Sequence, residues 1–318
     1  MRRKFAVSYG LHSKVNEVNF EDWNRRNRMG EPFKVNVTQC WPGYGQWGSD
    51  EGKADFERHP DWFSDPQGDG KRTRGKPCYS NPDVIQIGIK RALDYFEKNP
   101  NAYMLTVSPP DGGNYCVCKS CQALCKKLSG ASEIFTKNPD KEAQFGKQFY
   151  GKLPDGSLAS VSSDAHFNYV NKVAEAVAKK YPGKMVGTLG YAATAHPPSF
   201  DLLPNVYVEV TNGFRWGTPL SFEDQVKGFG KHCRNVGVYE FFNFRAIGDC
   251  PPAQPAKQRV SQTQVMKSRL ETLYKCNVRG IEGEMSYNWG SEGLGCAGPA
   301  IVGSPTSDRN PHTTRRLC

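Results

Sequence analysis

The stretch from residue 101 to residue 125, NAYMLTVSPPDGGNYCVCKSCQALC, decides the fold that we expect. It begins with apolar residues at alternate positions (Tyr103, Leu105 and Val107), continues into a Pro-Pro-Asp-Gly-Gly loop, and ends with four cysteines. In parallel α/β barrels, each buried strand ends in a loop that presents polar side chains at one working face. The stretch therefore predicts a buried strand that places Asp111 at such a face.

Eight segments have strand-like patterns, and helix-like patterns alternate with most of them. The predicted strands are residues 5–9, 33–41, 77–80, 103–108, 184–191, 205–211, 236–242 and 278–285. The predicted helices are residues 19–28, 82–98, 163–180, 222–233 and 261–276. Repeated strand and helix favours a parallel sheet, and eight strands favour its closure into a (β/α)8, or TIM, barrel.

The end of the chain differs from the rest. From Gly295 onward the sequence has many turn formers and no apolar period. We expect residues 1–295 to form the barrel and residues 296–318 to form an irregular tail, so that the last barrel helix is missing. There is no run of about 18 apolar residues, and MRRKFAVSYGLH at the start lacks an apolar stretch of signal-peptide length. We therefore expect neither a membrane span nor an export signal in this chain.

The net charge of +10 raises the question of nucleic-acid binding. The basic residues are scattered as short pairs, and they form no arginine-rich arm or recognition helix. A solvated basic surface is the preferred interpretation, and a basic cleft for an acidic sugar such as a uronic acid also fits. We expect no nucleic-acid partner.

Four carboxylates lie at or near the ends of predicted strands. They are Asp111, Glu240, Glu282 and Glu284. Glycoside hydrolysis needs two acids about 5 to 10 Å apart, and a barrel supplies them from the ends of different strands. Glu282 and Glu284 are two residues apart, so they face the same way on a strand, which favours proton sharing or metal binding. These four are the candidate catalytic residues, and a salt bridge to a helix lysine or arginine is the alternative for each.

Aromatic residues gather near the same strand ends. A sugar ring presents apolar C–H faces, which suit a cleft lined by aromatic rings and a few polar groups. Packing within the core or the loops is the alternative for each residue. The candidate substrate-binding residues, including one histidine and one arginine that can bind hydroxyl or carboxylate groups, are Trp41, His59, Tyr191, Trp216, Trp289 and Arg25.

The four cysteines of the opening stretch are Cys116, Cys118, Cys121 and Cys125. Thiolates this close in sequence can surround one tetrahedral zinc ion. One or two disulfides, or free thiols, are the alternatives, and eleven cysteines in total leave at least one unpaired. The sequence thus predicts at most a structural zinc, with no cofactor required for catalysis.

Several segments together resemble a known family. They are WNRRNRMG (23–30), HPDWF (59–63), GKR (70–72), CYSNP (78–82), SPPDGGNYCVCKSC (108–121), HPP (196–198), VYEFFN (238–243) and GIEGEMSYNWGSEGLG (280–295). Over about residues 5–295 the chain resembles the bacterial domain-of-unknown-function family numbered 4838. That family is similar to TIM barrels of the α-glucuronidase and β-hexosaminidase type, and its members usually form part of larger secreted proteins.

The resemblance implies a glycosidase that acts on plant or algal polysaccharide, secreted or periplasmic in full-length form, of which this chain is a fragment. It implies Glu240 as nucleophile or base and Asp111 as acid. Such barrels usually carry Glu after the fourth strand, so Glu284 is the second candidate for the acid. The rival hypotheses are a non-catalytic carbohydrate-binding barrel, a truncated inactive fragment, and a metal-dependent hydrolase using Glu282, Glu284 and a histidine.

Overall fold

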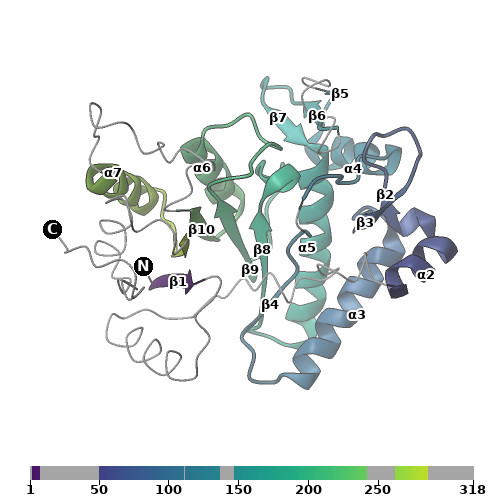
Figure 1. The fold of residues 1–318 in the computed structure, drawn as a ribbon, viewed down its shortest axis with the longest axis horizontal. Coiled ribbons are helices and arrows are strands. Elements are labelled where there is room, and N and C mark those ends of the chain that lie inside the picture. Colours follow the sequence, from purple (N-terminus) through teal and green to yellow (C-terminus); the bar gives the residue numbers. More distant parts are fainter. Residues whose placement is uncertain (1, 8–49, 111, 137–146, 242–261, 286–318) are drawn as a thin grey trace, which may run out of the picture. The chain divides into compact units, whose positions relative to one another are not determined.

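The computed structural model describes residues 2–7, 50–110, 112–136, 147–241 and 262–285 (Figure 1). It divides into two compact units, Met1–Pro32 with Val238–Cys318 and Phe33–Gly237. Both units have parallel strands, and helices alternate with strands along the chain. The expected parallel α/β class is therefore confirmed.

A parallel sheet forms the centre of the larger unit. Strands β4 (Met104–Thr106), β8 (Met185–Gly190) and β9 (Val206–Thr211) are neighbours in that order, and β10 (Asn235–Phe241) begins beside β9. Met104 pairs with Met185, and Gly187 pairs with Tyr207. Every residue of β8 and β9 is buried, which explains why both strands have nearly continuous apolar sequences.

Helices cover one face of this sheet. Helix α5 (Val161–Lys180) packs against β8, α3 (Pro82–Lys98) packs against α5, and α6 (Phe222–His232) packs against β9. His166 Nε2 of α5 and Thr188 Oγ1 of β8 form a 2.8 Å hydrogen bond on this face. The opposite face carries a buried cluster of four residues, Met104, Met185, Leu189 and Tyr207. Successive strand residues point to opposite faces, so Thr188 and Leu189 lie on opposite sides of the sheet.

Smaller elements surround the sheet, and several of them depart from the predictions. Helix α2 (Asp50–Arg58) and the short helix η2 (Pro60–Trp62) lie where the sequence predicts neither a helix nor a strand. The strand predicted at residues 77–80 lies earlier in the chain. Strand β3 (Thr73–Pro77) ends at Pro77 and pairs with β2 (Phe63–Ser64) in an antiparallel hairpin. After β3, Cys78 begins a turn that leads into α3, in which Asn81 N donates to Cys78 O.

The region from 130 to 156, which the sequence suggests is a surface insertion, contributes to a second sheet. Strands β5 (Glu133–Thr136), β6 (Phe149–Lys152) and β7 (Leu158–Ser160) pair in antiparallel fashion. Helix α4 (Lys119–Ser129) packs against α5 and against β6. The cysteine run therefore continues from a loop into a helix.

In the smaller unit, β1 (Arg2–Val7) pairs in parallel with β11 (Gly280–Met285), which follows α7 (Gln262–Lys275). Lys4 lies opposite Glu282 and Ala6 lies opposite Glu284. The strand predicted at 278–285 is confirmed, and the first strand begins earlier than its predicted start at residue 5.

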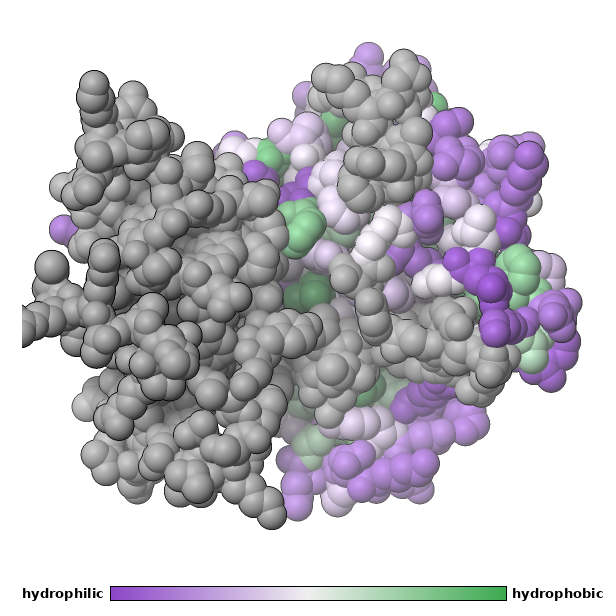
Figure 2. All heavy atoms as spheres, in the orientation of Figure 1, coloured by the Kyte–Doolittle hydropathy of each residue, from purple (hydrophilic) through white to green (hydrophobic). Residues whose placement is uncertain are grey.

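Closure into an eight-stranded barrel is not seen among the strands in the described ranges. The predicted helix 19–28, the predicted strand 33–41 and the predicted tail 296–318 lie outside those ranges. None of the described helices is long and apolar enough to cross a membrane. On the face shown in Figure 2, the residues that are not grey are mainly hydrophilic, with apolar residues between them.

Candidate metal centre and polar strand ends

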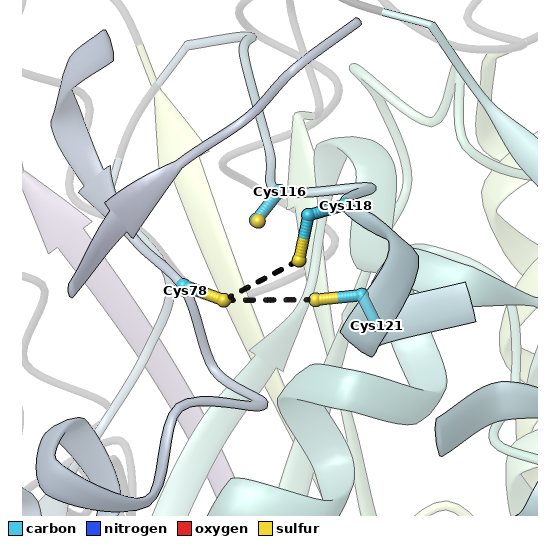
Figure 3. A group of neighbouring side chains, drawn as sticks. All are labelled: Cys78, Cys116, Cys118 and Cys121. Atoms are coloured by element: carbon cyan, nitrogen blue, oxygen red, sulfur yellow. Dashed lines mark hydrogen bonds between the residues drawn. The ribbon is translucent and has the colours of Figure 1, made fainter. Parts of the chain in front are cut away.

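Four buried cysteines converge in the larger unit (Figure 3). Cys78 follows β3, Cys116 and Cys118 belong to the loop before α4, and Cys121 lies in the first turn of α4. Their Sγ atoms all lie within 4.8 Å of one another. Cys78 Sγ is 3.8 Å from Cys118 Sγ and 3.9 Å from Cys121 Sγ. Two segments that are distant in the sequence thus bring four sulfur atoms together.

Local structure explains the positions of two of these side chains. Cys118 is the N-cap residue of α4, and Cys121 is three residues further on. Residues three apart in a helix lie on the same side, so both thiols face the same direction. Gly130 ends the helix in the left-handed conformation that glycine adopts most easily.

Hydrogen-bond donors surround the sulfur atoms. The backbone N–H of Asp65 and the Arg72 guanidinium donate to Cys116 Sγ at 3.3 and 3.5 Å. The Ser80 hydroxyl lies 3.1 Å from Cys121 Sγ and 3.3 Å from Cys78 Sγ. Such donors stabilise negative charge on sulfur and orient the thiolates of a metal site.

The four thiols differ in their ease of ionisation. Hydrogen bonding with Cys116 lowers the pKa of Cys78 to about 7, and it also lowers the pKa of Cys118. The pKa values of Cys116 and Cys121 are raised, because hydrogen bonding to Cys118 and Cys116 respectively retains their protons. Four adjacent thiolates repel one another, so ionisation of all four requires a cation among them.

The structure places Cys78, and not Cys125, beside the other three cysteines. Cys125 is buried on α4, and its thiol donates to Asp164 Oδ2 at 3.3 Å. Burial is the main cause that raises the pKa of Cys125. The cysteines within the described ranges are free thiols, with no disulfide among them. The sequence does contain a signal for Cys78, since it is the first residue of the quoted segment CYSNP.

A second group of side chains lies where β8 and β9 end. Tyr191 follows β8, and Phe214 and Trp216 follow β9. The ring centroid of Tyr191 is 6.2 Å from that of Phe214 and 6.3 Å from that of Trp216, with the rings edge to face. Phe214 is 44% exposed, although it is a large apolar residue. This aromatic cluster therefore offers a partly exposed apolar surface at the carboxyl ends of two parallel strands.

A carboxylate that the sequence analysis did not single out lies in β9. Glu209 is buried, and the Tyr207 hydroxyl donates to its Oε1 at 3.3 Å. Leu189 pairs with Glu209, so Glu209 lies on the sheet face opposite the helices. The signal in the sequence is the single acid in the otherwise apolar strand VYVEVT.

The sequence profile of the family described as "Domain of unknown function (DUF4838)" matches residues 3–297. The chain belongs to the DUF4838 family. No curated protein matches the DUF4838 chain in sequence. The family resemblance is thereby confirmed, and the relationship to glycosidase barrels remains a prediction.

The DUF4838 structure brings together only some of the predicted site residues. Tyr191 and Trp216 are in contact, whereas His59 lies between α2 and η2 and stacks on Trp62 at 4.0 Å. Glu240 is the next to last residue of β10, and Glu282 and Glu284 lie in β11. The remaining predicted site residues lie outside the described ranges, and they are Arg25, Trp41, Asp111 and Trp289.

Proposed function

We propose that this DUF4838 chain is a glycoside hydrolase acting on a polysaccharide or oligosaccharide, including chains that contain uronic acids. The observation that supports this proposal best is the aromatic cluster of Tyr191, Phe214 and Trp216 at the carboxyl ends of β8 and β9. Active sites of parallel α/β barrels form at these ends, and sugar rings stack on exposed aromatic faces.

The proposal includes closure of the parallel sheet into a (β/α)8 barrel, which gathers the strand ends around one opening. Glu240 is the proposed nucleophile or base because it comes next to last in β10. Asp111, which follows β4, is the proposed acid, and Glu284 is the second candidate. Glu209 is added as a further candidate because it is a buried carboxylate with a tyrosine donor, on the face with the apolar cluster.

The net charge of +10 supports an acidic substrate. A basic surface raises the local concentration of negatively charged polysaccharides, and this attraction weakens as salt is added. A neutral substrate would show no such dependence. Comparing release from acidic and neutral polysaccharides at low and high salt therefore identifies the substrate class.

The test is a release assay on aryl glycosides and polysaccharides, with the native chain and with the variants Glu240→Gln and Glu209→Gln. We expect Glu240→Gln to lower the rate by at least about 100-fold, because it removes an essential acid or base. Glu223→Gln is the matched control, since Glu223 lies on the surface of α6 and pairs with Lys227. A folded native chain that releases no sugar from any substrate would refute hydrolysis.

The second candidate is a non-catalytic carbohydrate-binding barrel, which the aromatic cluster favours equally well. In that case calorimetry would detect oligosaccharide binding by the native chain, and Trp216→Ala would weaken it. Hydrolysis would then be absent in every variant. Stacking of sugar rings on the aromatic cluster would be retained in Glu240→Gln.

A further inference from the structure

We propose that Cys78, Cys116, Cys118 and Cys121 bind one zinc ion, and that this centre holds in place the loop between β4 and α4. Residue 111, the proposed acid, belongs to that loop, so any effect of the ion on catalysis rests on the proposed function. The binding of the ion and the ordering of the loop do not depend on that function, and each has its own measurement.

The distances between the sulfur atoms fit a single tetrahedral ion. With Zn–S bonds of about 2.3 Å, the sulfur atoms of a tetrahedral site lie about 3.8 Å apart. The two measured separations from Cys78 Sγ are 3.8 and 3.9 Å, and no pair exceeds 4.8 Å. A disulfide requires about 2.05 Å, so these sulfur atoms are spaced for an ion between them.

The surroundings fit a structural site with no open position. All four cysteines are buried, and four thiolates complete the coordination of zinc. The resulting negative charge is offset by the Arg72 guanidinium and by the backbone N–H of Asp65, both of which donate to Cys116 Sγ. The Asp65 carboxylate accepts hydrogen bonds from Gly68 N and Gly70 N at 2.7 and 2.9 Å, and these bonds fix the turn that carries its N–H.

Two residues next to the cysteines hold the start of the loop. The Lys76 ammonium donates to Pro110 O at 2.6 Å, and the Tyr115 hydroxyl donates to the same oxygen at 3.2 Å. Lys76 precedes Cys78 by two residues, and Tyr115 directly precedes Cys116. The Lys76 ammonium also lies 4.3 Å from the centroid of the Tyr115 ring.

An ion shared by Cys78 and Cys116 therefore keeps both donors on Pro110, the residue before position 111. Val117 N adds a bond to Asp65 O at 2.9 Å, which joins the cysteine loop to the β2–β3 hairpin. Loss of the ion would leave four buried thiols to separate or to ionise unequally, and the loop would lose its attachment to the hairpin.

The first experiment measures the metal content of the purified native chain by mass spectrometry. We expect about one zinc per chain, and cobalt exchanged into the site should give the absorption bands of a tetrahedral thiolate complex. Cys78→Ser should lose the zinc, Cys78→His should retain it, and Cys125→Ser is the matched control that should keep it. In the zinc-loaded native chain, four thiols should resist alkylation, and a chelator should make the same four reactive. This measurement needs no variant.

The second experiment measures amide hydrogen exchange with and without a chelator. We expect faster exchange at residues 112–118 after zinc removal and unchanged exchange in α6. Any of four results would overturn the metal site. They are a native chain without zinc, iron in place of zinc, a disulfide between any two of the four cysteines, and full zinc retention in a folded Cys78→Ser variant. Unchanged exchange at 112–118 would overturn the loop attachment. A chain that binds zinc but releases no sugar would refute only the proposed function.

Discussion

Replacing Asp164 by asparagine tests how burial controls the stability of the larger unit. Asp164 lies in the first turn of α5 and is fully buried. Its carboxylate accepts hydrogen bonds from Ser199 N at 2.9 Å, from the Ser199 hydroxyl at 2.8 Å and from the Cys125 thiol at 3.3 Å. Burial outweighs these bonds and raises the pKa of Asp164 from its ordinary 3.8 to about 6.

The direction of the effect follows from the protons bound in each state. Between pH 3.8 and about 6 the folded chain holds a proton on Asp164 that the unfolded chain has lost. The free energy of unfolding therefore falls as the pH rises through this range. The stabilisation from the protonated Asp164 carboxyl group is fully present below its unfolded pKa of 3.8 and is lost above its folded pKa of about 6. At about 1.4 kcal/mol per pH unit, the whole change amounts to about 3 kcal/mol.

Asparagine carries no charge at any of these pH values, so Asp164→Asn removes this contribution. The free energy of unfolding of the variant, minus that of the native chain, should therefore rise by about 2 to 3 kcal/mol as the pH increases from about 4 to 7.5. Urea unfolding followed by circular dichroism at several pH values measures the difference. Burial lowers the pKa of His166 to about 3 in both chains, so its titration cancels in the difference.

Glu57→Gln, at an exposed position on α2, is the control and should follow the native pH profile. Parallel profiles for the native chain and Asp164→Asn would refute the reasoning. They would mean that the three hydrogen bonds to the carboxylate compensate fully for its burial.

Two further substitutions test the local structure. Asn81 caps α3 by accepting hydrogen bonds from Asp83 N at 2.8 Å and Val84 N at 3.3 Å. Asn81→Ala should therefore lower the free energy of unfolding in urea by about 1 kcal/mol. An unchanged midpoint would show that water replaces the cap. A Cβ on Gly217 would overlap the backbone of Ala193. Gly217→Ala should therefore lower the free energy of unfolding by about 1 to 3 kcal/mol. It should also alter the tryptophan fluorescence, because Trp216 of the aromatic cluster is the neighbouring residue. A Gly217→Ala variant with the midpoint and fluorescence of the native chain would contradict the overlap.

Apolar periodicity predicted the larger elements of the fold. The sequence placed α3, α5, α6, β8 and β9 within a few residues of their observed bounds. These elements bury long apolar sets, such as Phe167, Val170 and Val173 on α5, so their pattern is visible in the sequence alone. Helix α4 was not predicted, because its only buried residues are Cys121 and Cys125 within a lysine-rich segment.

The sequence by itself determined the family, the parallel α/β class and the presence of a cysteine run after a buried strand. Only the tertiary structure decided which cysteines meet. Cys78 precedes Cys118 by 40 residues and Cys121 by 43. It lies beside them in a structure where Val117 N, before α4, donates to Asp65 O, after β2. Cys125 has the closer spacing, yet it lies one helical turn beyond Cys121, where its thiol donates to Asp164 of α5. Spacing along a chain describes local conformation, whereas a four-ligand site depends on how distant segments pack.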